Sequence, residues 1–263
     1  MTTQNMLILC TGEKGGVGKS TLARGLLDLD RSDGRRVAAY DADGEVGQLI
    51  QHFGERDDDG RLLADQDPES GVVPFDVRAE GDRDTLLNLL DQRAPRVVVD
   101  LPAAALHELA QLLDDSAQSF IEEVRTAGYR PVVVIVITPL LASIRSARRL
   151  LDALGDACDF VVVKNGFYGD AEAFPLYDGY TDGRGATVGG KTRTALEEQG
   201  GVTVAMPALQ ARTYSLLDVY NLSFAQAVQD DRLPRADRSR VHRWRGHLRA
   251  NLSEAGEILE VRS

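Results

Sequence analysis

Two lysines lie five residues apart on either side of a glycine cluster near the start of the chain, in GEKGGVGKST (12–21). The stretch follows the apolar run MLILC (6–10) and precedes a segment with helical periodicity that begins near Lys19. In this context the backbone N–H groups of Gly15 to Ser20 can converge on phosphate oxygens. Lys19 would then reach the β- and γ-phosphates of a nucleotide, and the Ser20 hydroxyl would bind Mg²⁺.

The strict phosphate-loop pattern GxxxxGK[ST] fails at one position, where Glu13 replaces the first glycine. The alternative is a glycine turn that binds no ligand. A strand, a glycine-rich turn and a helix in this order are the context that a phosphate loop requires, so we favour the phosphate loop.

Carboxylates follow two other apolar runs. Asp41 and Asp43 come directly after VAAY (37–40), and Asp100 follows VVV (97–99). At the carboxyl end of a parallel strand, Asp100 can hold Mg²⁺ through water. For Asp41 and Asp43 the alternative is an ordinary turn rich in Asp and Gly.

Apolar runs without alternation recur along the chain and predict strands that are buried on both faces of a parallel sheet. They lie at 6–10, 37–40, 72–75, 97–99, 132–137, 160–163 and 202–205. Helical segments are expected between and after them, at about 19–31, 84–92, 105–127, 142–155, 191–199, 211–229 and 237–259. The alternation predicts an α/β fold with a doubly wound, mostly parallel sheet. Two long stretches, 55–71 and 166–190, are predicted to be loops.

The composition bounds the function. At 263 residues and 43% hydrophobic content, the chain suits one large α/β domain or two small ones. No apolar run approaches the length of a membrane span, and no signal peptide is evident. Cys10 and Cys158 form no CxxC pair and are expected to be buried, which indicates a cytoplasmic protein without a cluster site. The net charge of −11 argues against nucleic-acid binding by the whole surface, yet leaves room for a local basic patch.

Such a patch is predicted in the last helical segment, which carries seven arginines between positions 232 and 249 against the single acidic residue Asp237. One helix face would hold Arg235, Arg238, His242, Arg245 and Arg249. An adjoining apolar stripe, expected to pack on the body, consists of Val241, Trp244, Leu248, Leu252 and Ala255. The basic face either contacts the phosphate backbone of DNA or is a solvated face that balances an acidic body.

The motif KGGVGKS (14–20) resembles the deviant Walker A motif of the ParA/MinD family of ATPases. The resemblance implies that Lys14 is the family's extra lysine, which reaches across a nucleotide-sandwich dimer to the phosphates of the partner subunit. It also implies that Asp43 orients or activates the attacking water near Mg²⁺, and that Asp41 supports the water shell of the metal. A cation supplied in trans would make hydrolysis depend on dimerisation.

Further resemblances extend along the chain to residue 207. VVVDLP (97–102) looks like the Walker B strand. FVVVKN (160–165) resembles the strand whose final residue, here Asn165, recognises the edge of the adenine base. The dipeptide MP (206–207), with Pro207, resembles the proline loop that closes over the base. The implied nucleotide-binding residues are Lys14, Gly15, Gly16, Val17, Gly18, Lys19, Ser20, Thr21, Asn165 and Pro207. The implied metal-site residues are Ser20, Asp43 and Asp100.

Some branches of the family are excluded by absent features. The reductases and cluster carriers need cluster cysteines, and membrane attachment of the MinD kind needs a basic C-terminal amphipathic helix, whereas SEAGEILEVRS (253–263) is acidic. The combination of VDLPAAA, VKNGF, a long insert and a late basic segment looks similar to the plasmid-encoded StbB and TraL ATPases. Those proteins act in plasmid stability and conjugative transfer.

These observations predict a P-loop ATPase domain over residues 1–233 and a C-terminal helical segment, 234–263, packed on the same domain. The expected cofactors are ATP and Mg²⁺. The expected partners are a second copy of the chain across ATP, nonspecific DNA and a small DNA-binding or mobilisation protein, without a membrane. A metabolic synthetase on the same fold, or a nucleotide-binding interaction protein without turnover, are the alternatives.

Overall fold

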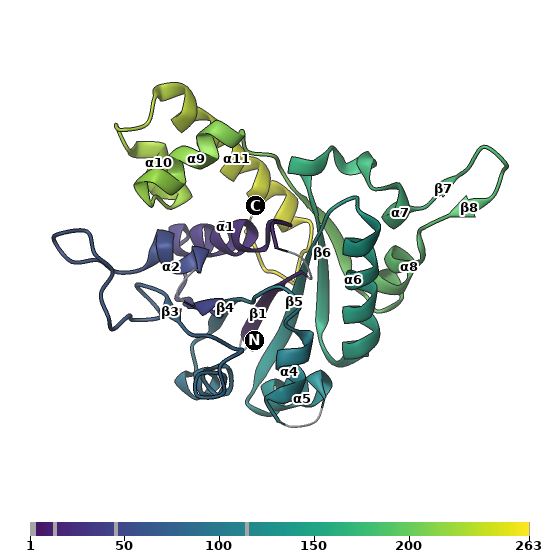
Figure 1. Cartoon of the computed structure of the whole chain (residues 1–263), viewed down its shortest axis with the longest axis horizontal. Helices are drawn as coiled ribbons and strands as arrows, with labels where there is room; N and C mark the ends of the chain where they lie inside the picture. Colours follow the sequence, from purple (N-terminus) through teal and green to yellow (C-terminus); the bar gives the residue numbers. More distant parts are fainter. Residues whose placement is uncertain (1–3, 13–14, 45–46, 114–115, 263) are drawn as a thin grey trace.

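A seven-stranded sheet forms the centre of the molecule (Figure 1). The computed structural model describes residues 4–12, 15–44, 47–113 and 116–262. Within them the strand order is β3-β2-β4-β1-β5-β6-β9, and every neighbouring pair is parallel. The strands are β1 (Asn5–Thr11), β2 (Ala38–Asp41), β3 (Val73–Pro74), β4 (Arg96–Asp100), β5 (Tyr129–Ile137), β6 (Asp159–Asn165) and β9 (Val202–Met206). The predicted parallel, doubly wound sheet is confirmed.

Helices cover both faces of this sheet, since alternate strand residues point to opposite sides. Leu7 and Leu9 of β1 join one apolar cluster, whereas Met6 and Ile8 join the other. The first cluster is covered by α3 (Thr85–Asn88), α4 (Leu106–Gln111), α5 (Ala117–Thr126), α6 (Leu141–Leu154), α7 (Pro175–Asp178) and α8 (Lys191–Glu198). The second is covered by α1 (Lys19–Ser32), α2 (Gln48–Phe53), α9 (Ala211–Tyr220), α10 (Phe224–Gln229) and α11 (Arg235–Ser253).

Two of the predicted helices are each broken into two. The segment 105–127 divides into α4 and α5, because Ser116 takes an extended conformation and its side chain accepts the Ser119 N–H as an N-cap. The segment 211–229 divides at Asn221, which has a left-handed φ of 52°. The capping box of Ser223 with Gln226 then starts α10.

The stretch 166–190 contains short elements and is anchored to the sheet by Lys164. The ammonium of Lys164, at the end of β6, lies 2.7 Å from an oxygen of Asp178 and donates to the Ala171 carbonyl at 2.9 Å. Beyond α7, strands β7 (Tyr180–Thr181) and β8 (Thr187–Val188) form an antiparallel hairpin that projects from the body (Figure 1).

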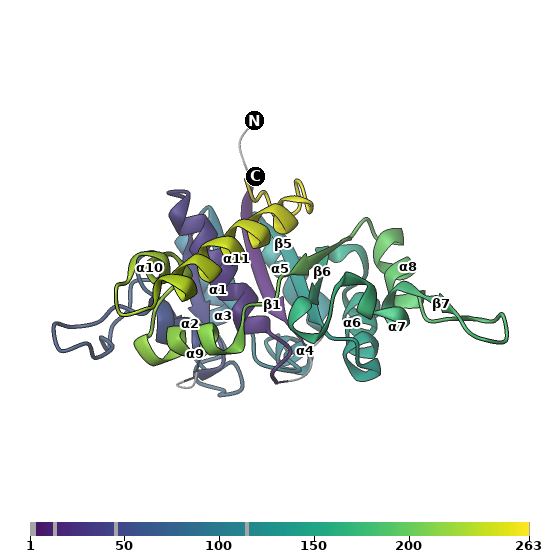
Figure 2. The same ribbon diagram turned by 90° about the horizontal axis from the view of Figure 1, so that it is seen from above.

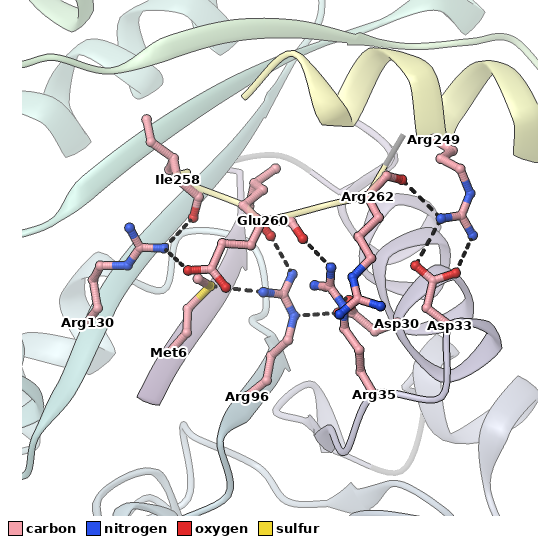
Figure 3. A network of polar contacts seen from close by, with 11 residues as sticks. Met6, Asp30, Asp33, Arg35, Arg96, Arg130, Arg249, Ile258, Glu260 and Arg262 are labelled. Atoms are coloured by element: carbon pink, nitrogen blue, oxygen red, sulfur yellow. Dashed lines mark hydrogen bonds and ion pairs between the residues drawn. The ribbon is translucent and has the colours of Figure 1, made fainter. Parts of the chain in front are cut away.

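Helix α11 lies along the helical layer over α1, as Figure 2 shows, and its predicted apolar stripe is buried. The tail after α11 runs back across the amino-terminal ends of the strands, where guanidinium groups bind its backbone carbonyls (Figure 3). Arg96 donates to the Leu259 carbonyl at 2.9 Å and to Asp30 at 2.5 Å, and Arg130 donates to the Ile258 carbonyl at 3.1 Å. The side chains that bind tail carbonyls are Arg35, Arg96, Arg130 and Arg249.

Among the helices that the structure describes, we find none with the length and apolar character that crossing a membrane requires.

Candidate nucleotide site

The glycine-rich loop joins the carboxyl end of β1 to α1, which begins at Lys19. Glu13 and Lys14 lie outside the described residues. Gly16 and Gly18 have φ values of 78° and 99°, a left-handed region that side chains disfavour. A Cβ on Gly18 would lie 2.5 Å from Nδ2 of Asn165, so this position has no room for a side chain. Gly16 and Gly18 therefore allow a left-handed backbone conformation, and Gly18 also allows the close approach of Asn165.

Next to this loop the structure has a cleft of about 570 Å³. The predicted site residues that line it are Gly15, Gly16, Gly18, Lys19, Ser20, Thr21, Asp43, Asn165 and Pro207. Val17 instead points into the core, where 4% of its surface is exposed. The cleft thus joins the loop, the segment after β2 and the ends of β6 and β9 in one place.

Two buried carboxylates lie behind the loop on adjacent strands, because Asp41 of β2 and Asp100 of β4 are register partners. Burial, together with the neighbouring charge of Asp41, raises the pKa of Asp100 to about 7, although a hydrogen bond from Ser20 lowers it. Oδ1 of Asp100 is buried and has no hydrogen-bond partner among the described residues. A buried oxygen in this state beside the Ser20 hydroxyl fits a hydrated divalent cation.

Asp41 has a structural contact that the sequence did not reveal. Its Oδ2 accepts the backbone N–H groups of Leu49 at 2.7 Å and of Ile50 at 3.1 Å, at the start of α2. Burial raises the pKa of Asp41 to about 6, and these backbone hydrogen bonds act in the opposite direction. Asp41 therefore orients the helix that follows the Asp43 segment, and its expected support of the metal's water shell remains a prediction.

Asp43 lies at the cleft, and its carboxylate is paired with Arg78. The Arg78 Nη1 donates to Oδ1 of Asp43 at 2.9 Å, and both side chains are partly exposed. Nothing in the sequence marked Arg78, which follows β3 and approaches Asp43 only through the sheet topology. For Asp43 to orient the attacking water as predicted, its ion pair with Arg78 must break when the nucleotide binds.

The predicted base pocket is present, but part of its polar capacity is used by the protein itself. Asn165 donates from Nδ2 to the Val17 carbonyl at 2.8 Å and accepts the Phe167 N–H at 3.0 Å. One N–H and one lone pair of the amide remain, so adenine recognition by Asn165 stays a prediction. The Pro207 carbonyl accepts Nε1–H of Trp244 at 2.7 Å, which fixes the loop at the end of β9 to α11.

A buried polar cluster adjoins the site and connects α1 to α9 and α2. The hydroxyls of Thr21 and Tyr214 lie 3.0 Å apart, and Arg24 donates to Tyr214 at 2.8 Å. Nη2 of Arg24 lies 3.2 Å from Nδ1 of His52. Burial and the Arg24 charge lower the pKa of His52 to about 3, so that the imidazole is neutral at pH 7. Arg24 carries no motif, and sequence reasoning missed this cluster.

The basic face of α11 is not uniformly open. Arg245 donates to the buried Asp28 of α1 at 2.7 Å, and Arg249 binds both oxygens of Asp33 at 2.7 and 2.9 Å. These two arginines therefore balance acidic residues of the body, which is the alternative to DNA contact given for this segment. Arg235 is exposed, and Arg238 is half-buried and pairs with the exposed Asp231. DNA contact by the four arginines remains a prediction, with Arg235 and Arg238 facing outward.

The loop, the cleft and the buried carboxylates together define a P-loop nucleotide-binding protein. The expected cofactors, ATP and Mg²⁺, fit this site. The family described as the CobQ/CobB/MinD/ParA nucleotide binding domain matches residues 8–173, which is more than half of the chain. The chain belongs to this family.

Curated relatives agree with this membership. Protein MobD of Acidithiobacillus ferrooxidans is 27% identical over 254 residues, which cover 97% of this chain and 96% of that protein. The septum site-determining protein MinD of Synechocystis is 28% identical over 170 residues, covering 57% of this chain and 59% of its own length.

Solved structures share the fold. A ParA family ATPase from Chlorobium tepidum has a TM-score of 0.53 at 15% identity, covering 94% of this chain and 100% of its own. The MinD protein complexed with Mg-ADP from Pyrococcus horikoshii has a TM-score of 0.53 at 12% identity, covering 98% and 99%.

Proposed function

We propose that the protein is an ATP-dependent, dimerising switch that hydrolyses ATP slowly and positions or segregates DNA or protein cargo. The setting would be plasmid partition, plasmid stability or conjugative transfer. The observation that carries the proposal is the cleft that brings Lys19 and Ser20 of the loop together with Asp43, directly in front of the buried Asp100. The whole-length likeness to MobD and the deviant loop motif support it.

Each described residue has a chemical role in this proposal. Lys19 neutralises the β- and γ-phosphates, and the Ser20 hydroxyl with Asp100 holds Mg²⁺ and its water. Bound Mg²⁺ supplies charge neutralisation for the phosphoryl oxygens. Asp43, once released from Arg78, orients the water that attacks the γ-phosphate.

The expected dimer rests on Lys14, which lies outside the described residues. Two facing loops that both carry ATP would bring strongly negative phosphates together, and a lysine from each side would offset the repulsion. A metabolic synthetase would not need this lysine and would turn over rapidly only with its substrate. An interaction protein without turnover would not need the combined Lys19, Ser20, Asp43 and Asp100.

Nucleotide binding is tested by Lys19→Ala, with Lys191→Ala as the matched control because Lys191 is exposed on α8, far from the cleft. Calorimetry should show that Lys19→Ala abolishes ATP binding, since it removes the main cation that faces the phosphates. Unchanged ATP affinity in Lys19→Ala would refute the P-loop assignment.

The switch is tested by comparing Asp43→Ala with Lys14→Ala at saturating ATP. Asp43→Ala should bind ATP, lose hydrolysis and accumulate as the dimer in light scattering. Lys14→Ala should bind ATP with little loss but neither dimerise nor hydrolyse. If Lys14→Ala forms as much dimer as Asp43→Ala, the proposed role of Lys14 in the partner's site is refuted. If Asp43→Ala hydrolyses ATP at the wild-type rate, Asp43 has no catalytic role and is only part of a turn.

DNA binding is proposed for the outward part of the α11 face, and Arg184→Ala at the exposed β7–β8 hairpin serves as the control for charge. Arg235→Ala with Arg238→Ala should weaken binding to all DNA sequences alike and flatten its salt dependence. Arg245→Ala with Arg249→Ala also breaks the ion pairs with Asp28 of α1 and with Asp33 directly after it, so the stability of this variant must be measured alongside. If the variant with all four arginines replaced by Ala retards DNA as strongly as wild type, the proposed DNA binding by this face is refuted.

A further inference from the structure

The chain turns sharply over the phosphate loop directly after β6. Asn165 ends the strand, and its side-chain oxygen accepts the Phe167 N–H at 3.0 Å, which closes the turn. Gly166 lies so close to β9 that a Cβ there would be 2.8 Å from the Met206 carbonyl oxygen. The turn therefore brings Tyr168, two residues after Gly166, to the loop, and Tyr168 also lines the cleft.

Two side chains of this turn bind two successive carbonyls of the phosphate loop. The Tyr168 hydroxyl donates to the Gly16 carbonyl at 2.8 Å, and Nδ2 of Asn165 donates to the Val17 carbonyl at 2.8 Å. The ring of Phe167 packs edge-on against Tyr168 with centroids 5.5 Å apart, which restricts the tyrosine. The loop is thus held from one side by a single short segment.

Because peptide groups are planar, fixing the two carbonyls also fixes the direction of the N–H groups in the same peptides. In a trans peptide the C=O of one residue and the N–H of the next point in opposite directions. The Gly16 carbonyl shares its peptide with the N–H of Val17, and the Val17 carbonyl shares its peptide with the N–H of Gly18. Binding both carbonyls on the β6 side therefore turns both N–H groups to the other side of the loop, as phosphate binding requires.

We propose that Tyr168 and Asn165 are positioning residues that aim the Val17 and Gly18 amides at the phosphates of the nucleotide. The inference rests on the proposed ATP binding, but not on dimerisation or hydrolysis. Tyr168 acts through its hydroxyl, and its ring serves only to place that group. Because Asn165 also stands in the predicted base pocket, Tyr168 is the residue that isolates the effect.

Tyr168→Phe removes the hydroxyl and keeps the ring. Without this bond the nucleotide itself must order the loop, at a cost of up to the net energy of one neutral hydrogen bond. Calorimetry should therefore show ATP and ADP binding weakened by about two- to tenfold. Pyrophosphate, which has no base, should lose affinity by the same factor. The nucleotide-free thermal midpoint should fall only slightly, because the substitution removes one hydrogen bond of a residue that is 41% exposed.

Two controls separate the hydroxyl from other effects. Tyr180→Phe makes the same chemical change at a tyrosine that is 44% exposed on β7, away from the cleft, and should bind ATP like wild type. Tyr168→Ala should lose little more affinity than Tyr168→Phe, since the ring contributes only placement.

Three results would overturn the proposal. Unchanged ATP affinity in Tyr168→Phe would show that the hydroxyl does not position the loop. Tighter or faster binding would show that Tyr168 is a lid that closes the loop against the nucleotide. Weakened ATP binding with unchanged pyrophosphate binding would place Tyr168 at the base. Dimerisation is measured separately, by light scattering. Its failure would refute the proposed switch but not the role of Tyr168.

Discussion

Asp100→Asn should stabilise the nucleotide-free, magnesium-free protein at alkaline pH. Ionised Asp100 is buried beside Asp41, and its pKa is about 7 in the folded protein against an ordinary value of 3.8. Each pKa unit corresponds to 1.36 kcal/mol, so the ionised carboxylate costs about 4 kcal/mol of folding free energy at pH 8. Asparagine has nearly the same shape and avoids this cost.

The sign follows from proton binding. Because the folded-state pKa lies above the unfolded one, the folded protein binds more protons between about pH 4 and pH 7. The contribution of Asp100 to stability is fully present below about pH 4 and is lost as the pH rises through about 7. The gain from Asp100→Asn should therefore be about 2–3 kcal/mol larger at pH 8 than at pH 5.

The assay is urea unfolding in EDTA at both pH values, where any fixed effect of the amide cancels in the comparison. Asp33→Asn is the matched control, because the hydrogen bond from Arg249 lowers the pKa of Asp33 and its effect should be constant over this range. Added Mg²⁺ should stabilise wild type but not Asp100→Asn. A gain that is equal at pH 5 and pH 8 would refute the reasoning.

Three further substitutions test other contacts. Gly18→Ala should abolish ADP binding in calorimetry, because its Cβ would lie 2.5 Å from Nδ2 of Asn165 and its φ is 99°. Arg78→Ala should change the thermal midpoint little, since its ion pair with Asp43 is partly exposed and such pairs contribute about 0–1 kcal/mol. Asp237→Ala should cost about 2–4 kcal/mol in urea unfolding, because this fully buried carboxylate accepts hydrogen bonds that join α9 to α11.

The sheet and the loop could be predicted because their signals are local. Unbroken apolar runs specify strands that are buried on both faces, and GGVGKS after such a run places the start of α1 at Lys19. The division at Asn221 was also readable, since S-x-x-Q beginning at Ser223 is a capping box. That signal was missed because the helical period continues across it.

The site contacts that could not be predicted join residues far apart in the sequence. Arg78 reaches Asp43 across 35 positions, and Arg245 reaches Asp28 across 217. Helical spacing showed that Arg245 and Arg249 share a face, but it carries no information about what lies opposite that face. The carboxylates of Asp28 in α1 and of Asp33 directly after it lie there, and their position opposite α11 is a property of the assembled fold.

The carbonyl contacts of the tail have a consequence for how the protein opens. A segment beyond the last helix normally frays, and its amide hydrogens exchange with solvent quickly. Here Arg96, only 5% exposed, spans 163 positions to reach the Leu259 carbonyl. Detachment of the tail would leave that guanidinium buried without this acceptor. The N–H groups of Ile258 and Glu260 donate to the Ala255 and Gly256 carbonyls. These two amides should therefore exchange only with large-scale unfolding of the sheet, as those of an internal strand do.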